Sequence, residues 1–238
     1  MTTAIIIPCY NEEKRLNFNK IINLSNLLGP DNHIYLVNDG STDDTAELIT
    51  KFLKEEKSKR IFFLNFKTNE GKAEVIRKSI FKLKELPYEI VGYFDADFST
   101  PAEEMLNLYN EMLSHNYLFC IASRVQLLNS GIERKPIRHI IGRIVITIIN
   151  FKEKLGIYDT QCGAKFFKKN ILIQVLDKPF YTSWLFDIEI FLRLRKLNFL
   201  SLGKELPINN WKDIDGSKLS WKSAFQIINQ IYIIFKKY

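Results

Sequence analysis

The sequence contains few cysteines, and their spacing excludes two kinds of scaffold. Cys9, Cys120 and Cys162 are the only three in 238 residues, and no Cys-x-x-Cys pair occurs. An odd number at such wide separations argues against a disulfide framework and against a structural zinc site. We therefore expect three buried thiols in a protein held together by an apolar core, for which a hydrophobic content of 46% is ample.

Long apolar runs and targeting signals are also missing. No segment reaches the roughly 18 uninterrupted apolar residues of a membrane-spanning helix. The start, MTTAIIIPCY, has neither the basic region nor the long apolar region of a signal peptide. We therefore expect a cytoplasmic protein, with peripheral contact to the inner face of the membrane left open.

Acidic residues are fewer than basic ones, with 27 Asp+Glu against 34 Lys+Arg and a net charge of +7 at pH 7. Such a bias suits nucleic acid, an anionic membrane surface or phosphorylated substrates. The chain shows no helix-turn-helix, zinc-finger or RNP-like aromatic motif, so we expect no nucleic-acid partner.

Apolar runs that are typical of buried strands alternate with helical stretches along the first half of the chain. The runs lie at 4–7, 34–37, 61–64, 90–94 and 118–122. Parallel strands need a crossover helix between them, and this alternation provides one after each run. The sequence therefore predicts an α/β fold with a Rossmann-like, doubly wound, mostly parallel sheet and helices on both faces.

Two aspartates follow the fourth apolar run directly. Asp95 and Asp97 are separated by one residue, so both can point the same way from the end of a strand. Ligands of open α/β sheets bind at this end, and an Asp-x-Asp pair suits Mg²⁺ or Mn²⁺ that carries substrate phosphates. The alternative is that the two acids are ordinary cap or turn residues.

Two later stretches have helical, amphipathic spacing. Residues 137–155 mix isoleucines with basic side chains, as in a core-packed helix with a solvated basic face, or in a helix lying on a membrane surface with its cations towards lipid phosphates. Residues 220–238 carry a second apolar stripe, which either contacts lipid or packs back onto the domain. The stripe consists of Trp221, Ala224, Phe225, Ile228, Ile231, Tyr232 and Phe235.

Asp187 and Glu189 lie within an apolar helical run. Burying unpaired carboxylates is costly, so these acids either face a cleft or pair with cations. Arg193 lies one helical turn from Glu189 and could be such a partner.

Several motifs occur together in the same order as in one known family. The segments IIIPCYNEEKRL, VNDGSTDDT, NEGKAEVIRKSI, YFDADFSTP, ASR, DTQCGAKFF, SWLFDIEI and NWKDIDGSK resemble family 2 glycosyltransferases of the GT-A fold, and more narrowly their dolichyl-phosphate β-glucosyltransferase-like branch. The resemblance implies an inverting transferase that uses a nucleotide sugar and Mg²⁺ or Mn²⁺. We expect one GT-A domain at 1–218, with a nucleotide-binding half at about 1–124 and an acceptor half at about 125–218, followed by an amphipathic helix at 219–238.

The resemblance also implies a donor site. Asp39 would read a uracil base by accepting its imide N–H, although a turn plus helix cap also explains Asp39-Gly40-Ser41. Asp95 and Asp97 would hold the metal, with Asp97 as the direct ligand. The nucleotide-binding residues would be Pro8, Tyr10, Glu12, Asp39, Lys72 and Asp95.

The acceptor side is implied in the same way. An acceptor hydroxyl would need a carboxylate base, for which Asp187 is the first choice and Asp159 the second, whereas an ionised lipid phosphate would need none. Arg124 would bind phosphate through its planar fork. The residues implied for the acceptor, phosphate or sugar are Arg124, Gln161, Glu189 and Lys218.

The expected activity is transfer of a hexose, with glucose preferred, from a UDP-sugar to polyprenyl or dolichyl phosphate at the cytoplasmic membrane face. The alternatives are extension of a lipid-linked or surface glycan at a sugar hydroxyl, and an inactive nucleotide-sugar-binding protein. The chain departs from the family pattern at Asn38, where an acid usually precedes Asp39. It also has no apolar run that matches the membrane segment of many relatives.

Overall fold

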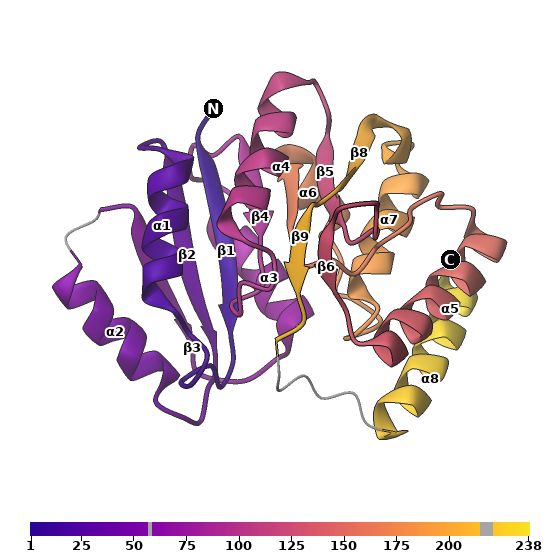
Figure 1. Cartoon of the computed structure of the whole chain (residues 1–238), viewed down its shortest axis with the longest axis horizontal. Coiled ribbons are helices and arrows are strands. Elements are labelled where there is room, and N and C mark those ends of the chain that lie inside the picture. The colour runs from indigo at the N-terminus through magenta and orange to yellow at the C-terminus, as the bar shows by residue number, and fades with distance from the viewer. Residues whose placement is uncertain (57–58, 215–220) are drawn as a thin grey trace.

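The structure is a computed structural model that describes residues 1–56, 59–214 and 221–238. A seven-stranded sheet in the order β3-β2-β1-β4-β7-β5-β8 forms its centre (Figure 1). The strands are β1 (Thr3–Cys9), β2 (Asn32–Asp39), β3 (Ile61–Phe66), β4 (Ile90–Tyr93), β5 (Phe119–Ser123), β7 (Lys165–Lys168) and β8 (Gly203–Pro207). A separate parallel pair, β6 (Gly131–Glu133) and β9 (Asn210–Lys212), stands beside the sheet.

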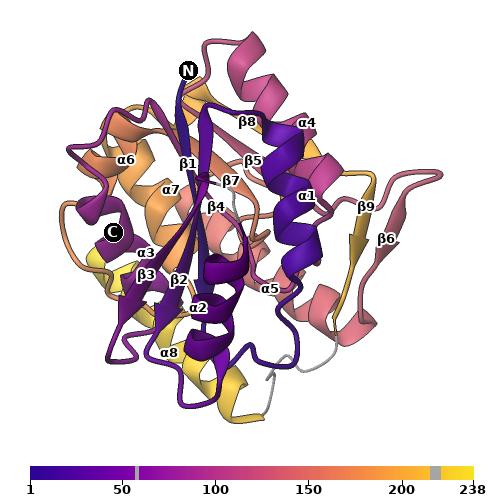
Figure 2. The same cartoon turned by 90° about the vertical axis from the view of Figure 1, so that its left-hand side faces the viewer.

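Helices cover both faces of this sheet, as Figure 2 shows for α1 and α4 on one side and α6 and α7 on the other. The first face carries α1 (Phe18–Leu28), α2 (Thr45–Glu55) and α4 (Ala102–Ser114). The second face carries α3 (Lys72–Lys82), α5 (Pro136–Glu153), α6 (Lys169–Val175), α7 (Phe186–Lys196) and α8 (Trp221–Lys237). A short 3₁₀ turn, Leu200–Leu202, precedes β8.

The apolar runs form strands because both of their faces are buried. In β1, Ala4 and Ile6 belong to the core beneath α3, while Ile5 and Ile7 belong to the core beneath α1. Alternate side chains of a strand point to opposite faces, so a strand between two helix layers must be apolar at every position. The predicted doubly wound, mostly parallel sheet with helices on both faces is confirmed.

One strand runs against the rest. β7 lies between β4 and β5 and is antiparallel to both. Because it runs in the opposite direction, its first residue, Lys165, pairs with Tyr93 at the end of β4. The DTQCGA turn that precedes β7 therefore lies beside the two aspartates that follow β4.

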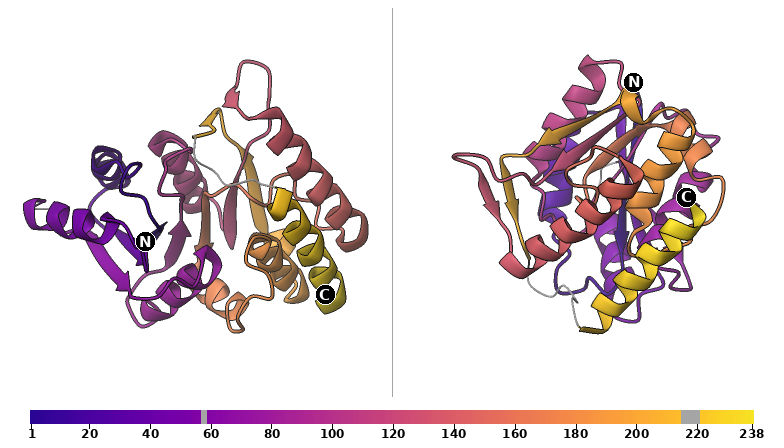
Figure 3. Two further views of the ribbon diagram at one scale, coloured as in Figure 1. Left: turned by 90° about the horizontal axis from the view of Figure 1, so that it is seen from below. Right: turned by 90° about the vertical axis from the view of Figure 1, so that its right-hand side faces the viewer.

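Helix α8 packs onto the domain and lies beside α5 (Figure 3). Ile227 and Ile234 are buried in the core of the second face, and Ile231 and Phe235 pack against it. The predicted stripe is thus divided, because Ile231 and Phe235 face the core whereas Ile228 and Tyr232 are exposed. The side chains of Trp221, Ala224 and Phe225, and residues 215–220, lie outside the described part of the chain.

Helix α5 differs from the prediction of a solvated basic face. Its inner side buries Val145 and Ile149, but isoleucines occupy much of its exposed side as well. Within the described residues, no helix combines the length and the apolar character needed to cross a membrane.

Candidate active site

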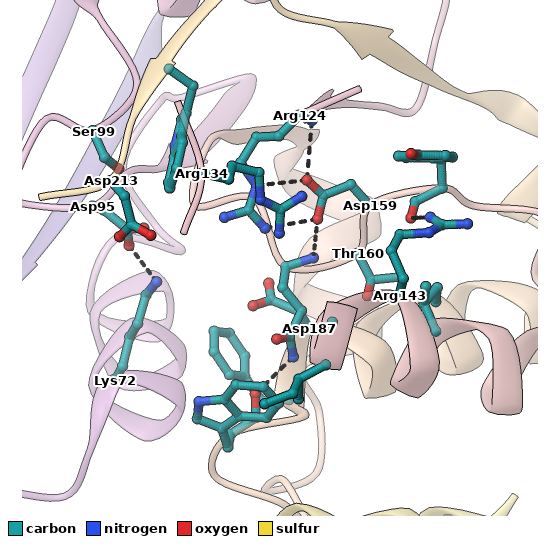
Figure 4. Close-up of a pocket in the computed structure, with 18 of the residues that line it drawn as sticks. Lys72, Asp95, Ser99, Arg124, Arg134, Arg143, Asp159, Thr160, Asp187 and Asp213 are labelled. Atoms are coloured by element: carbon teal, nitrogen blue, oxygen red, sulfur yellow. Dashed lines mark hydrogen bonds and ion pairs between the residues drawn. The ribbon is translucent and has the colours of Figure 1, made fainter. Parts of the chain in front are cut away.

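A cleft of about 310 Å³ lies at the carboxyl ends of β4 and β5 (Figure 4). Lys72 and Asp95 line one side of it, and Arg124 and Asp159 line the other. A smaller cavity of about 180 Å³ shares Lys72, Asp95 and Asp97 with the cleft. The acid pair therefore stands where the two spaces meet.

The smaller cavity gathers the residues predicted for the nucleotide. They come from the ends of three parallel strands and from the start of α3, which meet at one edge of the sheet. The predicted residues that line this cavity are Pro8, Tyr10, Glu12, Asp39, Lys72, Asp95 and Asp97.

Asp39 is buried and holds the loop that precedes α3. Its carboxylate accepts hydrogen bonds from the backbone N–H groups of Glu70 and Gly71, both at 2.9 Å, and from Asn69 Nδ2 at 3.1 Å. Burial raises the pKa of Asp39, and the two backbone donors oppose that shift. Since a carboxylate offers about four acceptor positions, one remains on Oδ1 for a further donor.

Asp95 and Asp97, the acid pair, differ in the charges around them. Asp95 Oδ1 forms an ion pair with Lys72, and Asp97 Oδ1 accepts a hydrogen bond of 2.9 Å from the backbone N–H of Ser99. Burial raises the pKa of Asp97, and the charge of Asp95 raises it further. Burial acts in the same direction on Asp95, but the positive charges of Lys72 and Lys165 outweigh it and hold its pKa below the ordinary value.

Gly163 admits the Asp95 carboxylate. A Cβ built at Gly163 would overlap the carboxylate atoms of Asp95, so no larger residue fits without moving one of the two. This close approach explains the glycine of the DTQCG segment.

The two carboxylates fit a hard divalent cation. No group of three or more His, Cys, Asp or Glu side chains that could hold a metal occurs within residues 1–56, 59–214 and 221–238. Mg²⁺ and Mn²⁺ sites in nucleotide enzymes commonly use one or two carboxylates and complete their shell with phosphate oxygens and water. The repulsion that raises the pKa of Asp97 is the repulsion such a cation would relieve.

Asp187, at the start of α7, is fixed by two buried side chains, Tyr93 and Lys165. Its Oδ1 accepts a hydrogen bond of 2.6 Å from the Tyr93 hydroxyl and pairs with Lys165 Nζ at 2.8 Å. Lys165 is fully buried and also donates to the carbonyl oxygen of Cys162. Sequence reasoning missed Lys165 and Tyr93, although a lysine in the apolar run GAKFF signals a buried carboxylate partner, because an unpaired buried ammonium is costly.

Asp159 is tied to Arg124 by a bidentate pair. Arg124 Nε and Nη2 donate to the two carboxylate oxygens at 2.6 and 2.8 Å, and the Arg124 backbone N–H adds a third bond of 3.1 Å. Burial raises the pKa of Asp159, but Arg124 outweighs it and holds the pKa far below the ordinary value. The guanidinium also lies over the Trp211 ring, 5.0 Å from its centroid. The Arg124 fork that we expected to bind phosphate is therefore occupied by Asp159.

The structure separates the other predicted acceptor residues. Gln161 lines the cleft, and its Nε2 donates to the carbonyl of Trp184 at 3.2 Å. Glu189 is fully buried and does not line the cleft; its oxygens accept from Thr182 at 2.6 Å and pair with Arg193 at 3.3 Å. Of the two expectations for Glu189, pairing with a cation is the one the structure shows. Lys218 lies outside the described residues.

Arg134 is a cleft residue that sequence reasoning missed. In the described chain, no hydrogen bond or ion pair joins its guanidinium to another residue, although it lines the cleft beside Arg124 (Figure 4). Burial and the charge of Arg124 lower its pKa. Arg143, from α5, lines the same space, but it donates to the Tyr158 carbonyl at 2.8 Å. Arg134 is therefore a cleft cation that no anion of the described residues binds.

Two curated relatives match most or nearly all of the chain. A dolichyl-phosphate beta-glucosyltransferase of Trichomonas vaginalis is 32% identical over 227 residues, covering 91% of this chain and 67% of that protein. The dolichyl-phosphate beta-glucosyltransferase of Dictyostelium discoideum is 29% identical over 252 residues, covering 99% and 74%. These matches confirm the predicted resemblance to that branch.

Solved structures confirm the fold. Glucosyl-3-phosphoglycerate synthase from Mycobacterium tuberculosis, bound to Mn²⁺, UDP-glucose and phosphoglyceric acid, superposes with a TM-score of 0.69 at 14% identity and covers 97% of this chain and 77% of its own. S. aureus TarS bound to UDP-GlcNAc gives a TM-score of 0.60 at 14% identity, with coverage of 98% and 66%. The family model described as Glycosyl transferase family 2 matches residues 4–176. With that match over most of its length, and the predicted motifs meeting around one cleft, the chain belongs to glycosyl transferase family 2.

Proposed function

We propose that the protein transfers a hexose, glucose first, from a UDP-sugar to polyprenyl phosphate. The observation that carries this proposal is the charge arrangement of the cleft. Asp159 and Asp187 are both paired with cations, whereas the Arg134 guanidinium has no bonded partner among the described residues. Such a cleft suits an anionic acceptor better than a neutral hydroxyl.

The smaller cavity is the proposed donor site. Lys72 borders it and can donate to the diphosphate of the nucleotide sugar, and Asp39 keeps one acceptor position for a uracil N–H. Asp95 and Asp97 would hold Mg²⁺ or Mn²⁺, which when bound acts as a Lewis acid on the departing diphosphate. The solved neighbour bound to Mn²⁺ and UDP-glucose has the same fold and supports this choice of donor and ion.

The choice of acceptor rests on the pairing of the two carboxylates predicted as bases, Asp159 and Asp187, with cations. A hydroxyl must lose its proton during the displacement, and a carboxylate that serves as the base should be able to take it up. The pKa of Asp159 lies far below its ordinary value because of Arg124, and Asp187 Oδ1 is occupied by Tyr93 and Lys165. A phosphate monoester, with a second pKa of about 6, is already ionised near neutral pH and needs no base.

In the proposed reaction, a phosphate oxygen of the acceptor attacks the anomeric carbon from the side opposite to UDP. The new carbon–oxygen bond forms as the bond to the diphosphate breaks, and UDP leaves with the electron pair. Arg134 would bind the acceptor phosphate, because its planar fork matches two phosphate oxygens. Asp187, fixed in the cleft by Lys165, would orient a sugar hydroxyl.

Relatives that carry the name dolichyl-phosphate beta-glucosyltransferase support the same acceptor class. Since a lipid-anchored phosphate and a water-soluble nucleotide sugar must reach one cleft, we assign the reaction to a membrane surface, at the cytoplasmic face. We propose that the described domain contacts this membrane surface peripherally.

A screen of UDP release tests the proposal. The protein is mixed with Mn²⁺ and either UDP-glucose or GDP-glucose, together with polyprenyl phosphate or, as the matched control, polyprenyl alcohol. We expect release only with UDP-glucose and polyprenyl phosphate. Faster release with the alcohol or with a glycan would favour a hydroxyl acceptor, and tight UDP binding without release in any mixture would favour an inactive binding protein.

A further inference from the structure

Helix α5 presents one apolar side to the core and a second apolar side to solvent. Val145 and Ile149 are buried, while the opposite side exposes a row of large apolar side chains at spacings of three and four residues. Their exposed fractions decide the point: Ile137 73%, Ile140 56%, Ile144 53%, Ile148 41% and Phe151 89%. We call these five residues the α5 stripe. Exposed apolar rows of this kind mark interaction surfaces.

We infer that the α5 stripe docks the protein on an anionic lipid surface, an inference that rests on the proposed lipid-phosphate acceptor. Exposed apolar side chains of a neighbouring helix extend the surface around the stripe. Helix α8 lies beside α5 in Figures 1 and 3, with Lys152 Nζ donating to the Phe235 carbonyl at 2.8 Å. On α8, Ile228 and Tyr232 are exposed.

The charges around the stripe favour lipid over a second copy of the chain. Across 136–153 and 221–237 the only acidic residue is Glu153, which is buried and paired with Arg195. The exposed charges at the carboxyl ends of the two helices are lysines, namely Lys152, Lys154, Lys236 and Lys237. A surface of apolar residues and cations attracts anionic headgroups, at roughly 1 kcal/mol per cation near the membrane. A second copy would bring like charges together.

Because α5 also lines the cleft, docking through the stripe would bring the cleft close to the lipid surface. Ile141, Gly142, Arg143 and Ile146 of the same helix line the cleft. The helix is about 10 Å across, so docking through the stripe leaves the cleft wall within about one helix diameter of the lipid surface. A polyprenyl phosphate could then enter the cleft with its chain still in the bilayer.

Vesicle co-sedimentation tests the inference. We compare the wild type with Ile140→Glu/Ile144→Glu, and with Leu86→Glu/Leu113→Glu, which alters net charge equally at exposed apolar residues away from α5 and α8. With vesicles of phosphatidylcholine containing phosphatidylserine, we expect the stripe variant to bind on the order of tenfold more weakly and the control variant to bind as the wild type does. Added salt should weaken wild-type binding, because screening shortens the reach of the lysines.

Wild-type protein that ignores these vesicles at low salt would overturn the inference, as would equal binding by the stripe variant. Wild-type dimers that the stripe variant loses, without vesicle binding, would assign the stripe to self-association instead. Circular dichroism of each variant controls for folding.

An activity arm separates this inference from the proposed function. With a short-chain polyprenyl phosphate dissolved in water, the stripe variant should transfer glucose at the wild-type rate, because no stripe residue lines the cleft. With a long-chain acceptor in vesicles it should be slower in proportion to its lost binding. If the wild type binds vesicles but transfers to neither acceptor, the proposed function fails and the docking stands. If it transfers to both acceptors without binding vesicles, the proposed function stands and the docking fails.

Discussion

At the scale of single residues, buried ion pairs fix the side chains that line the cleft. Lys165 is fully buried and pairs with Asp187, and Arg124 donates two side-chain hydrogen bonds to Asp159. Removing one partner of such a pair leaves an uncompensated charge, whereas removing both together can be nearly neutral. These pairs therefore fix the geometry of the site, and the fold loses stability when only one member of a pair is removed.

Lys165→Met should destabilise the fold by about 3–5 kcal/mol, because it leaves Asp187 buried without its cation. Urea unfolding of Lys165→Met, Asp187→Leu and the double variant measures the coupling. The double variant should recover part of the loss. Additive losses in the double variant would show that the two side chains do not interact.

The stabilisation from the Arg124–Asp159 pair should be complete above about pH 5 and should decrease progressively as the pH is lowered further. The folded-state pKa of Asp159 lies below the unfolded value of about 3.9, so the unfolded chain binds more protons in this range and stability falls as the pH is lowered. Asp159→Asn lacks this contribution. The difference in unfolding free energy between wild type and variant should therefore be constant above about pH 5 and shrink from about pH 5 to pH 3; a difference that stays constant over the lower range would contradict the pairing.

Gly163→Ala should weaken metal binding without unfolding the protein, because the added methyl group displaces the Asp95 carboxylate. Disturbing the contacts that hold a metal ligand in place typically lowers metal affinity by about tenfold to a hundredfold. Calorimetric titration of Mn²⁺ in the presence of UDP measures the change. Asp97→Asn, which removes a proposed ligand but keeps the volume, is the reference for complete loss, and unchanged affinity in Gly163→Ala would remove Asp95 from the site.

At the scale of elements, the antiparallel strand β7 and the helix α8 complete the site. β7 brings the DTQCGA turn to the aspartates after β4. Gln230 of α8 accepts hydrogen bonds from the backbone N–H groups of Trp184 and Leu185, at 2.9 and 3.0 Å, and so fixes a segment that lines the cleft. In both cases the two segments that meet, the DTQCGA turn and the aspartates after β4, or Gln230 and the 184–185 backbone, are distant in sequence.

Ile234→Ala should cost about 2–5 kcal/mol of stability, because Ile234 lies on the inner side of α8 and is fully buried in the core. The matched control is Ile228→Ala on the exposed side of the same helix, which should change stability by no more than about 0.5 kcal/mol. Denaturant unfolding of both variants measures the two costs. Equal and small costs would show that α8 is not packed on the core.

Sequence patterns predicted the elements better than their long-range placement. Continuous apolar runs such as 4–7 predict buried strands because both faces of the sheet are covered, and the strand ends then predict a shared donor site. The periodicity of α5 predicts amphipathic character but not that the outer side carries Ile140 and Ile144. The Lys165–Asp187 pair depends on an antiparallel strand and a helix meeting, which no local pattern encodes.

At the scale of the whole molecule, the parallel half of the sheet supplies the cavity proposed for the donor, and the segments after β5 supply the side of the cleft proposed for the acceptor. Arg134 and α5 belong to this second part, which links the cleft to the α5 stripe. The proposed reaction therefore brings a soluble donor, a divalent cation held by Asp95 and Asp97, and a lipid-borne acceptor together in one cleft.

Mass analysis of the lipid product tests this account most directly. Purified protein is incubated with UDP-glucose, Mn²⁺ and polyprenyl phosphate, and the extracted lipid is analysed intact. We predict one hexose joined to the phosphate of the polyprenyl chain, formed in step with UDP and absent when the metal is chelated. Free glucose alone, or a hexose attached to a sugar hydroxyl while polyprenyl phosphate stays unmodified, would contradict the account.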